Sequence, residues 1–341
     1  MPHVVDMNPR ERQKANPKVP DSFIQKRFEL YKFLGGGAEG SVYKALDHRT
    51  GTKVAVKIAN RVKDSGIVSH EYEVRAYDSL YRLDGIPKLY WAGQERDYYC
   101  MVIQLMGPSL QGLIYEVGGK FSLKTTLLLA NQLLFRLEGF HKKGWLHRDI
   151  KPSNILIGVG KDAIRPYLAD LGLAEKYRPP YAEERYKTLK LLGTELYASW
   201  NAHYNRRQSY TDDLESLGYM LIEFMRGDLP WENINTSNRD HRHAAVANLK
   251  SETPLSVLCQ GLPREFEEYF NHIFSVEHGE MPDYNYLTKN FRKLFYRSGF
   301  REDMVYDWTP GRENKLKTRE REKEREKHED CGIRRCKRRK T

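Results

Sequence analysis

Hydrophobic and polar side chains alternate along three short runs near the N-terminal end of the sequence, and these runs are rich in β-branched and aromatic residues. They read FELYKFLG, GSVYKAL and KVAVKIA, and they are separated by glycines and by the turn sequence DHRTGT. Alternation of this kind predicts strands with one buried face, and short turns favour antiparallel neighbours. We therefore predict an antiparallel sheet that begins at residue 28.

Later stretches change to a helical period. SHEYEVRAYDSLYRL predicts one helix docked on the sheet, and DYYCMVIQLMG predicts one more strand. SLKTTLLLANQLLFRLEGFHKKG then predicts a long helix with Gly144 at its end, and DDLESLGYMLIEFMRG and LPREFEEYFNHIFSV predict further helices. The expected fold is α+β, with a small β-rich part that carries one main helix, followed by a larger, mainly helical part.

Composition sets the limits of the folded part. The chain has 341 residues, of which 40% are hydrophobic, and this is enough to bury a sizeable core. Residues 1–27 are polar and weakly periodic, so we expect a flexible arm there. From about residue 311 onward charges of both signs dominate, and this tail is either a solvated helix or disordered. The globular domain should therefore span residues 28–310.

The formal net charge of +11 is concentrated at the C-terminal end of the sequence. Without that basic end the globule is only modestly basic, so charge does not require a nucleic-acid-binding fold. The basic end is compatible with a nuclear import signal, with nucleic-acid contact, and with a solvated end that serves neither purpose. It contains six cations in the last eight residues, namely Arg334, Arg335, Lys337, Arg338, Arg339 and Lys340.

Cysteine usage and hydropathy indicate the compartment. Of the four cysteines, only Cys331 and Cys336 lie close together, and they lack the additional ligands that a tetrahedral zinc site needs. Free thiols in a reducing compartment are the simplest interpretation. The N-terminal stretch has no apolar segment of signal-peptide length, and Asn131 and Gln132 interrupt the most apolar run, residues 127–135. We expect a soluble protein of the cytoplasm, the nucleus or both, with no membrane contact.

Candidate chemistry begins at a glycine-rich loop. Gly35, Gly37 and Gly40 form G-x-G-x-x-G between two predicted strands. A strand–loop–strand setting favours a flap whose backbone N–H groups approach phosphate oxygens, although an ordinary glycine-rich hairpin has the same pattern. Lys57, in VAVK, ends the next β-rich run but one, and Glu73 on the following helix is a candidate partner. Pairing with Glu73 would hold the ammonium group of Lys57 against two phosphates.

The decisive segment is LHRDIKPSNILIG. Asp149, Lys151 and Asn154 occur there in the order H-R-D-x-K-x-x-N. This order would place a carboxylate near an incoming hydroxyl, a cation near a transferring phosphoryl group and an amide oxygen on a metal ion. About twenty residues further on, YLADLGLAEKY supplies Asp170 in a variant of the D-F-G element, where its carboxylate would bind magnesium.

Taken together, these motifs resemble those of eukaryotic protein kinases, and more narrowly those of a divergent casein kinase I family member, related to the vaccinia-related and tau-tubulin kinases. The narrower similarity rests on LMGPSL, FSLKTTLLLANQL, LLGTELYASWNAH, DDLESLGYMLIEFMRGDLPW, PDYNYLTKNFRKLFYRSGF and VYDWTP. It covers roughly residues 28–310. It implies a bilobal kinase fold, with an N-lobe at about 28–105 and a C-lobe at about 106–310.

The resemblance implies a serine/threonine kinase that uses ATP and Mg²⁺, acts on protein hydroxyl groups and is a monomer. Asp149 would orient and deprotonate the acceptor hydroxyl, Lys151 would stabilise the γ-phosphoryl charge, and Asn154 and Asp170 would hold magnesium. Pro152 after Lys151 is similar to the serine/threonine form. Ile103 would be the gatekeeper and residues 104–106 the hinge. The implied nucleotide contacts are Leu34, Gly35, Gly36, Gly37, Gly40, Val42, Ala55, Lys57, Glu73, Ile103, Gln104, Leu105 and Met106. Asp213 matches a residue that braces the catalytic loop, and it also suits a helix N-terminus by its charge.

Two departures from the family pattern bear on function. Glu39 stands at the flap tip, where the family carries an aromatic residue; its carboxylate either opposes the phosphates or points to solvent. GTELYAS places Glu195 and Leu196 where many relatives have an arginine that favours phosphate-primed substrates. Arg239 and Arg242 would preserve only part of that basic patch, so we expect no strong preference for primed sites.

Regulation and turnover are the remaining questions. The segment AEKYRPPYAEERYKTLKLLGTE contains Tyr181, Tyr186 and Thr188, but none has an evident obligatory phosphorylation role. By resemblance, we expect activity without phosphorylation of this segment. The competing hypothesis is a pseudokinase scaffold that binds nucleotide or partner proteins without turnover, and Glu39 is the feature that favours it.

Overall fold

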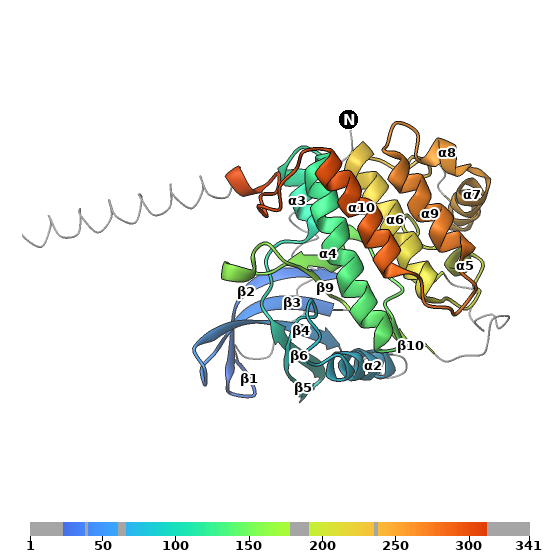
Figure 1. Cartoon of the computed structure of the whole chain (residues 1–341). Coiled ribbons are helices and arrows are strands. Elements are labelled where there is room, and N and C mark those ends of the chain that lie inside the picture. The colour runs from blue at the N-terminus through green and yellow to red at the C-terminus, as the bar shows by residue number, and fades with distance from the viewer. Residues whose placement is uncertain (1–22, 38–39, 61–65, 178–190, 235–237, 312–341) are drawn as a thin grey trace, which may run out of the picture.

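The computed structural model describes residues 23–37, 40–60, 66–177, 191–234 and 238–311. Figure 1 shows the sheet, in blue, below a larger set of helices coloured from green to red. This arrangement confirms the expected α+β fold with a small β-rich lobe and a larger helical lobe. Glu39, Tyr181, Tyr186 and Thr188 lie outside the described residues, as do the arm at 1–22 and the charged tail from 312 onward.

The N-terminal lobe is built on an antiparallel sheet with the strand order β1-β2-β3-β4-β6-β5. The runs predicted from alternation form β2, β3 and β4, which confirms those predictions. In β3 the burial alternates strictly between intermediate and buried positions, as one covered face requires. The strands are β1 Phe23–Ile24, β2 Phe28–Gly37, β3 Gly40–Asp47, β4 Thr52–Asn60, β5 Leu89–Glu95 and β6 Tyr98–Gln104.

The ordered sheet extends further toward the N-terminus than we predicted. The sequence predicts that residues 23–27 belong to a flexible arm, but β1 pairs with β2 and Ile24 is fully buried. Arg27 then binds both carboxylate oxygens of Asp47, with each N–O distance 2.7 Å. The prediction missed this because a two-residue strand is too short to show a period, and its stability comes from partners that are remote in sequence.

One main helix of the small lobe, α2 (Gly66–Ser79), follows the sheet strands β2 to β4, as predicted. Ala76, Tyr77 and, just beyond the helix, Leu80 are buried in the larger hydrophobic cluster. The same helix therefore contributes to the core and carries Glu73 toward the sheet. These buried apolar side chains fix the orientation of the helix and therefore the position of the Glu73 carboxylate.

The second lobe is mainly helical, and its longest helix is delimited by the residues that the sequence suggested. The hydroxyl of Ser122 accepts from the backbone N–H of Thr125 at the start of α4, and Gly144 has a left-handed φ of 75° just past its end. The helices are α3 Leu110–Glu116, α4 Leu123–Lys142, α5 Trp200–His203, α6 Tyr210–Arg226, α7 Arg239–Glu252, α8 Leu255–Leu258, α9 Arg264–Ser275 and α10 Tyr284–Arg297.

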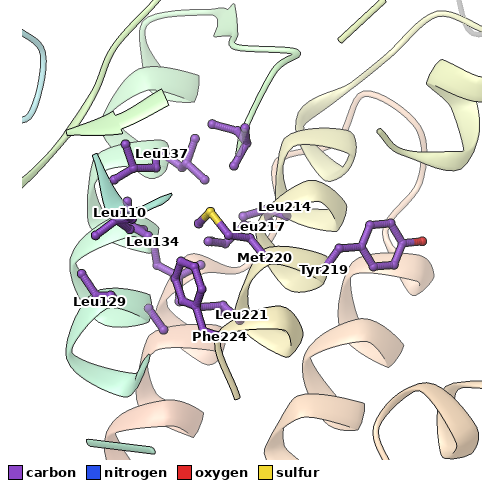
Figure 2. Packing of buried hydrophobic residues seen from close by; sticks show 14 of the residues in the cluster. Leu110, Leu129, Leu134, Leu137, Leu214, Leu217, Tyr219, Met220, Leu221 and Phe224 are labelled. Atoms are coloured by element: carbon purple, nitrogen blue, oxygen red, sulfur yellow. The ribbon is translucent and has the colours of Figure 1, made fainter. Parts of the chain in front are cut away.

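The core of this lobe lies between α4 and α6. Figure 2 shows Leu134 and Leu137 of α4 facing Leu217 and Met220 of α6, and all four side chains are at most 1% exposed. Helix α10 packs on α4 and on α9, so it covers the other side of α4. Truncating Leu134 to alanine in such a setting costs about 2–5 kcal/mol.

Short hairpins on this core carry the polar loops. Strand β7 (Trp145–Leu146) pairs with β10 (Glu175–Lys176), and β8 (Ile155–Ile157) pairs with β9 (Pro166–Leu168). The catalytic motif lies between β7 and β8, and Asp170 follows β9. No helix among the described residues has both the length and the apolar character needed to span a bilayer.

Candidate active site

The ion pair expected between the strand lysine and the helix glutamate is formed. Nζ of Lys57, on β4, lies 3.0 Å from Oε2 and 3.2 Å from Oε1 of Glu73 on α2. Nζ also lies 3.2 Å from Oδ1 of Asp170, which belongs to the other lobe. The side chain of Glu73 is only 2% exposed, so its carboxylate depends on this ammonium group for compensation. Lys57 therefore connects the sheet, the helix and the loop that follows β9.

Asp170 is held in an uncommon backbone conformation. Its φ is +60°, which is costly for a residue with a side chain. Burial raises the pKa of its carboxyl, but the contributions of the surrounding groups, foremost the charge and hydrogen bond of the Lys57 ammonium, together outweigh burial, so the pKa lies below its ordinary value and the group is ionised. The backbone N–H of Ala169 donates to the carbonyl of Asn154 over 2.9 Å, and this bond places Asp170 next to the catalytic motif.

Asp149 is the centre of a polar network. The Nδ2 group of Asn154 donates to Oδ2 of Asp149 over 2.9 Å and to its backbone carbonyl over 3.0 Å. Nζ of Lys151 lies 2.7 Å from Oδ2, and the hydroxyl of Thr194 donates to Oδ1 over 2.8 Å. Three neighbours from two segments thus fix the orientation of one carboxylate.

The backbone that carries Asp149 is braced from below by Asp213 in the first turn of α6. Oδ2 of Asp213 accepts from the N–H of His147 over 2.7 Å, and Oδ1 accepts from the N–H of Arg148 over 2.8 Å. Nε2 of His141 lies 2.9 Å from Oδ2. Burial raises the pKa of Asp213, but the hydrogen bonds that its carboxylate accepts, foremost the one from His141, outweigh the effect of burial, so the carboxyl stays ionised. Asp213 therefore supports the backbone of the catalytic loop and also lies at the N-terminal end of a helix, where a negative charge is favourable.

His147 completes this support. Its Nε2 lies 3.2 Å from the carbonyl oxygen of Ala169, and its Nδ1 lies 3.3 Å from the N–H of Asp149. A carbonyl oxygen can only accept, so Nε2 carries the proton and Nδ1 accepts. The ring therefore links the residue before Asp170 with Asp149 itself.

Comparison with known families agrees with this geometry. A family model described as the protein kinase domain matches residues 28–276, well over half of the chain. The chain belongs to the protein kinase family. Helix α10 lies beyond the matched residues, yet it packs on α4 and α9 as part of the same helical lobe.

Five of the predicted nucleotide contacts of this kinase lie on one face of the sheet. Val42 lies opposite Lys57 in the β3–β4 register, and Ala55 lies opposite Ile103 in the β4–β6 register. Directly paired residues and residues two apart on a strand share a face. Gly35 is the register partner of Val42 and joins the same set.

The hinge residues connect the lobes. Gln104 ends β6, and its side chain accepts from the N–H of Lys88 on the far side of the strand. Leu105 and Met106 follow without regular secondary structure, and the N–H of Gly107 then donates to the carbonyl of Ile157 over 2.7 Å. The chain between the two lobes is thus anchored at both ends.

The glycine-rich flap is a continuation of β2 and β3. Leu34 and Gly36 are exposed, and Gly37 is the register partner of Gly40. Gly40 has a φ of +131°, and a Cβ there would lie 2.3 Å from the carbonyl oxygen of Ile58. Only glycine fits this position, because the backbone of β4 lies against it, and both the flap and the ordinary hairpin interpretation agree with this packing.

The donor set fits magnesium, which the kinase family implies. Asn154 directs its Nδ2 group to Asp149, so its carbonyl oxygen Oδ1 is the atom left for a metal ion. Asp170 uses Oδ1 toward Lys57 and its side chain is 40% exposed. An amide oxygen and an ionised carboxylate are the hard oxygen ligands that Mg²⁺ takes.

Sequence reasoning missed Thr194. Its hydroxyl receives a hydrogen bond from Nζ of Lys151 over 2.7 Å and donates to Asp149. A Cβ on the preceding Gly193 would lie 2.7 Å from the carbonyl oxygen of Arg148, so glycine allows the two loops to approach. The only sequence signal was the Gly-Thr pair in GTELYAS, and nothing in it indicates contact with a motif more than forty residues earlier.

Proposed function

We propose that this protein is an active serine/threonine protein kinase, similar to casein kinase I, that transfers the γ-phosphoryl group of ATP to hydroxyl groups of proteins. The observation that supports this best is the Asp149 network. A carboxylate held by Asn154, Lys151 and Thr194 stands in one lobe, and Lys57 links the sheet and α2 to Asp170 beside it. These are the groups that phosphoryl transfer to a hydroxyl requires.

Each group has a role in that reaction. Asp149 accepts a hydrogen bond from the acceptor hydroxyl and takes its proton as the new oxygen–phosphorus bond forms and the bond from the γ-phosphorus to the bridging oxygen breaks, which releases ADP. Lys151, 2.7 Å from Asp149, stabilises negative charge on the transferring group, and Lys57 holds the phosphates. Magnesium, held by Asn154 and Asp170, would neutralise charge on the phosphate oxygens. Rate enhancement comes from position and charge, since the chain forms no covalent intermediate.

Serine and threonine are the proposed acceptors. Lys151 lies 2.7 Å from Oδ2 of Asp149 and is followed directly by Pro152, the sequence that is similar to the serine/threonine form of the catalytic loop. This local sequence is the ground for proposing serine and threonine rather than tyrosine.

The proposed substrates do not need a priming phosphate. Nε of Arg242 lies 2.8 Å from Oε1 of Glu195, and its terminal nitrogens donate to the carbonyls of Ile234 and Glu232. A substrate phosphate would have to displace the Glu195 carboxylate to reach this guanidinium. The side chain of Arg239 lies outside the described residues. The occupied guanidinium of Arg242 is the physical reason for weak priming dependence.

Matched peptides test this preference. Serine peptides with and without an upstream phosphoserine should be phosphorylated with similar kcat/KM by the intact chain. Glu195→Ala releases Arg242 and should favour the primed peptide by on the order of tenfold, the effect of one added charge-assisted contact. A strong primed preference in the intact chain would contradict the proposal.

The scaffold alternative is separated by a turnover assay. We expect magnesium-dependent transfer of labelled γ-phosphate to casein, abolished by Asp149→Asn and unaffected by Asp303→Asn, which removes an exposed carboxylate paired with Lys124. Phosphoamino-acid analysis of the product should show phosphoserine or phosphothreonine. Thermal stabilisation by ATP without any transfer would support the scaffold instead.

A further inference from the structure

A cavity of about 570 Å³ opens in the helical lobe, away from the catalytic motif. Its lining comes from α5, α6, α7, α8 and α9 and from the loops that adjoin them. No described residue that lines it belongs to the Asp149 network, and neither Lys57 nor Asp170 reaches it. Its size lies within the range of roughly 300–1,000 Å³ that is typical of small-molecule sites.

The walls of this cavity are mainly apolar and aromatic. Leu258 and Ile273 are buried side chains of its lining, and Phe274 of α9 is 52% exposed and forms part of its rim. Trp200 and Tyr219 add two aromatic side chains. Figure 2 shows Tyr219 pointing away from the α4 side of α6. A lining of this kind favours a ligand with an apolar body.

Glu215 is the buried acidic group of the cavity. The residue is 5% exposed, and its Oε1 accepts from the backbone N–H of Trp200 over 2.9 Å and from the hydroxyl of Tyr219 over 2.7 Å. Oε2 accepts a hydrogen bond from no residue that the structure describes, and it is not one of the oxygens that the fold seals off without a partner. Because Glu215 lines the cavity, Oε2 is the oxygen that a ligand can reach.

The nearby cation does not contact this carboxylate. Lys250 also lines the cavity and is 8% exposed, but its Nζ donates to the carbonyls of Glu195 and Ala198 over 2.9 and 2.7 Å. It also lies 3.2 Å from Nε2 of His203, so each of its three protons has a partner. In the described part of the chain, Lys250 therefore acts on Glu215 through its charge alone, without an ion pair.

Burial without a cation in contact makes the ionised form of Glu215 costly. Burial, and after it the charge of Asp212, raises the pKa of the Glu215 carboxyl to about 7. Burial also lowers the pKa of Lys250 to about 7, so this lysine releases its proton easily when another cation comes near. A positively charged group in contact with Oε2 would compensate the carboxylate that the fold leaves exposed to the cavity.

We propose that this cavity binds a small amphiphilic amine, whose ammonium group donates to Oε2 of Glu215 and whose apolar body lies against Leu258, Ile273 and Phe274. The rings of Trp200 and Tyr219 add attraction for the cation. A hydroxyl group could donate to the same oxygen but would leave the buried charge uncompensated, and a carboxylate would be repelled. The inference does not depend on the proposed kinase activity.

Three probes with one phenyl ring and different head groups test the proposal. They are 2-phenylethylamine, which is protonated at pH 7.5, 2-phenylethanol and phenylacetate, and isothermal titration calorimetry of the full chain measures their affinities. We expect the amine to bind more tightly than the alcohol by on the order of tenfold, because its hydrogen bond to Glu215 is charge-assisted, and phenylacetate to bind most weakly. Equal affinities for the three probes, or no binding of the amine, would overturn the proposal.

Two variants separate the carboxylate from the apolar wall. Glu215→Gln keeps an acceptor for Trp200 and Tyr219, and we expect the affinity for the amine to fall to that for the alcohol. Phe274→Ala removes a half-exposed ring, so it should fold and should weaken the amine and the alcohol by the same factor. Phe135→Ala, which removes an exposed ring of α4 outside the cavity, is the control and should change neither affinity. Full affinity for the amine in Glu215→Gln would refute the role of Glu215.

A labelled spectrum locates the bound amine. The chain has five tryptophans, so ¹⁵N labelling of tryptophan gives a simple spectrum, in which Trp200→Phe identifies the backbone signal of Trp200. This N–H donates to Glu215, and its signal should shift when 2-phenylethylamine is added but not when phenylacetate is added. Shifts confined to the other tryptophans would place the amine elsewhere and overturn the proposal. Neither measurement involves phosphate transfer, so the binding site and the kinase proposal stand or fall separately.

Discussion

The hydroxyl of Thr194 donates to Oδ1 of Asp149 over 2.8 Å while it receives a hydrogen bond from Lys151. Thr194 belongs to the loop before α5, which is remote in sequence from the catalytic motif. The contact means that the loop and the catalytic carboxylate move together. The orientation of Asp149 therefore depends on a residue that no catalytic motif contains.

Thr194→Val tests this dependence. Valine keeps the volume but cannot bridge the two charged groups, so we expect kcat to fall on the order of tenfold to hundredfold with KM for ATP nearly unchanged. Thr194→Ser keeps the hydroxyl and should retain most of the rate. Steady-state kinetics on casein measures both variants, and a valine variant with full kcat would show that Lys151 and Asn154 alone orient Asp149.

Loss of Lys57 should have a different signature. Lys57→Met leaves the carboxylate of Glu73, 2% exposed, without its ammonium partner, and breaking one side of a buried pair costs about 3–5 kcal/mol. We expect a lower melting temperature as well as loss of ATP-induced stabilisation, measured by thermal denaturation with and without ATP. The double variant Lys57→Met with Glu73→Gln should recover stability but not activity. If the single variant melts as the intact chain does, the pair has no structural role.

Asp213→Asn should damage both folding and turnover. The backbone N–H groups of His147 and Arg148 donate to different oxygens of Asp213, at 2.7 and 2.8 Å, so the NH2 group of an asparagine would face one of the two donors. One buried N–H is left unsatisfied, which costs about 1–3 kcal/mol. We expect a lower melting temperature and a reduced kcat. A fall in kcat that persists well below the melting transition would separate loop geometry from global stability.

Stability should depend on pH through Glu223 on α6. Burial raises the pKa of its carboxyl to about 7, and the Tyr197 hydroxyl that donates to it over 2.7 Å lowers the pKa by less. Between the ordinary carboxyl pKa and 7, the folded state binds more protons than the unfolded state. Stability from this group is therefore complete at low pH and is lost as the pH rises toward 7.

Glu223→Gln removes that titration. Glutamine keeps an acceptor for Tyr197, so the variant should match the intact chain near pH 5 and exceed its stability at pH 8 by on the order of 1–3 kcal/mol. Urea denaturation at the two pH values measures the difference. Equal curves for both proteins at pH 8 would mean that the carboxylate is fully solvated or paired when ionised.

The sequence was most informative where the pattern is local. Ser122 and Gly144 bracket α4 because capping is decided by residues next to the helix, and Gly227, with φ +91°, ends α6 for the same reason. The pairing of Lys57 with Glu73 could also be predicted, because a known motif relates the two positions. The sequence of α10 contributed only to the family resemblance, although Tyr284, Leu287, Phe291 and Leu294 recur at helical spacing.

Contacts that depend on tertiary approach could not be predicted. Thr194 reaches Asp149, and Glu175 reaches Arg148, only because Gly193 and the β7–β10 ladder bring separate loops together. The sequence shows each residue without its distant partner. The same limit explains why β1 was assigned to a flexible arm.

That first strand has a practical consequence for production of the protein. The match to the protein kinase family model begins at residue 28. A recombinant protein that starts at residue 28 would lack Ile24, which is fully buried, and Arg27, which binds Asp47. The recombinant protein would contain a void in the small lobe and a buried carboxylate without its guanidinium. Poor yield or aggregation of such a product would be a fault of the cloning boundary, and a start upstream of Phe23 avoids it.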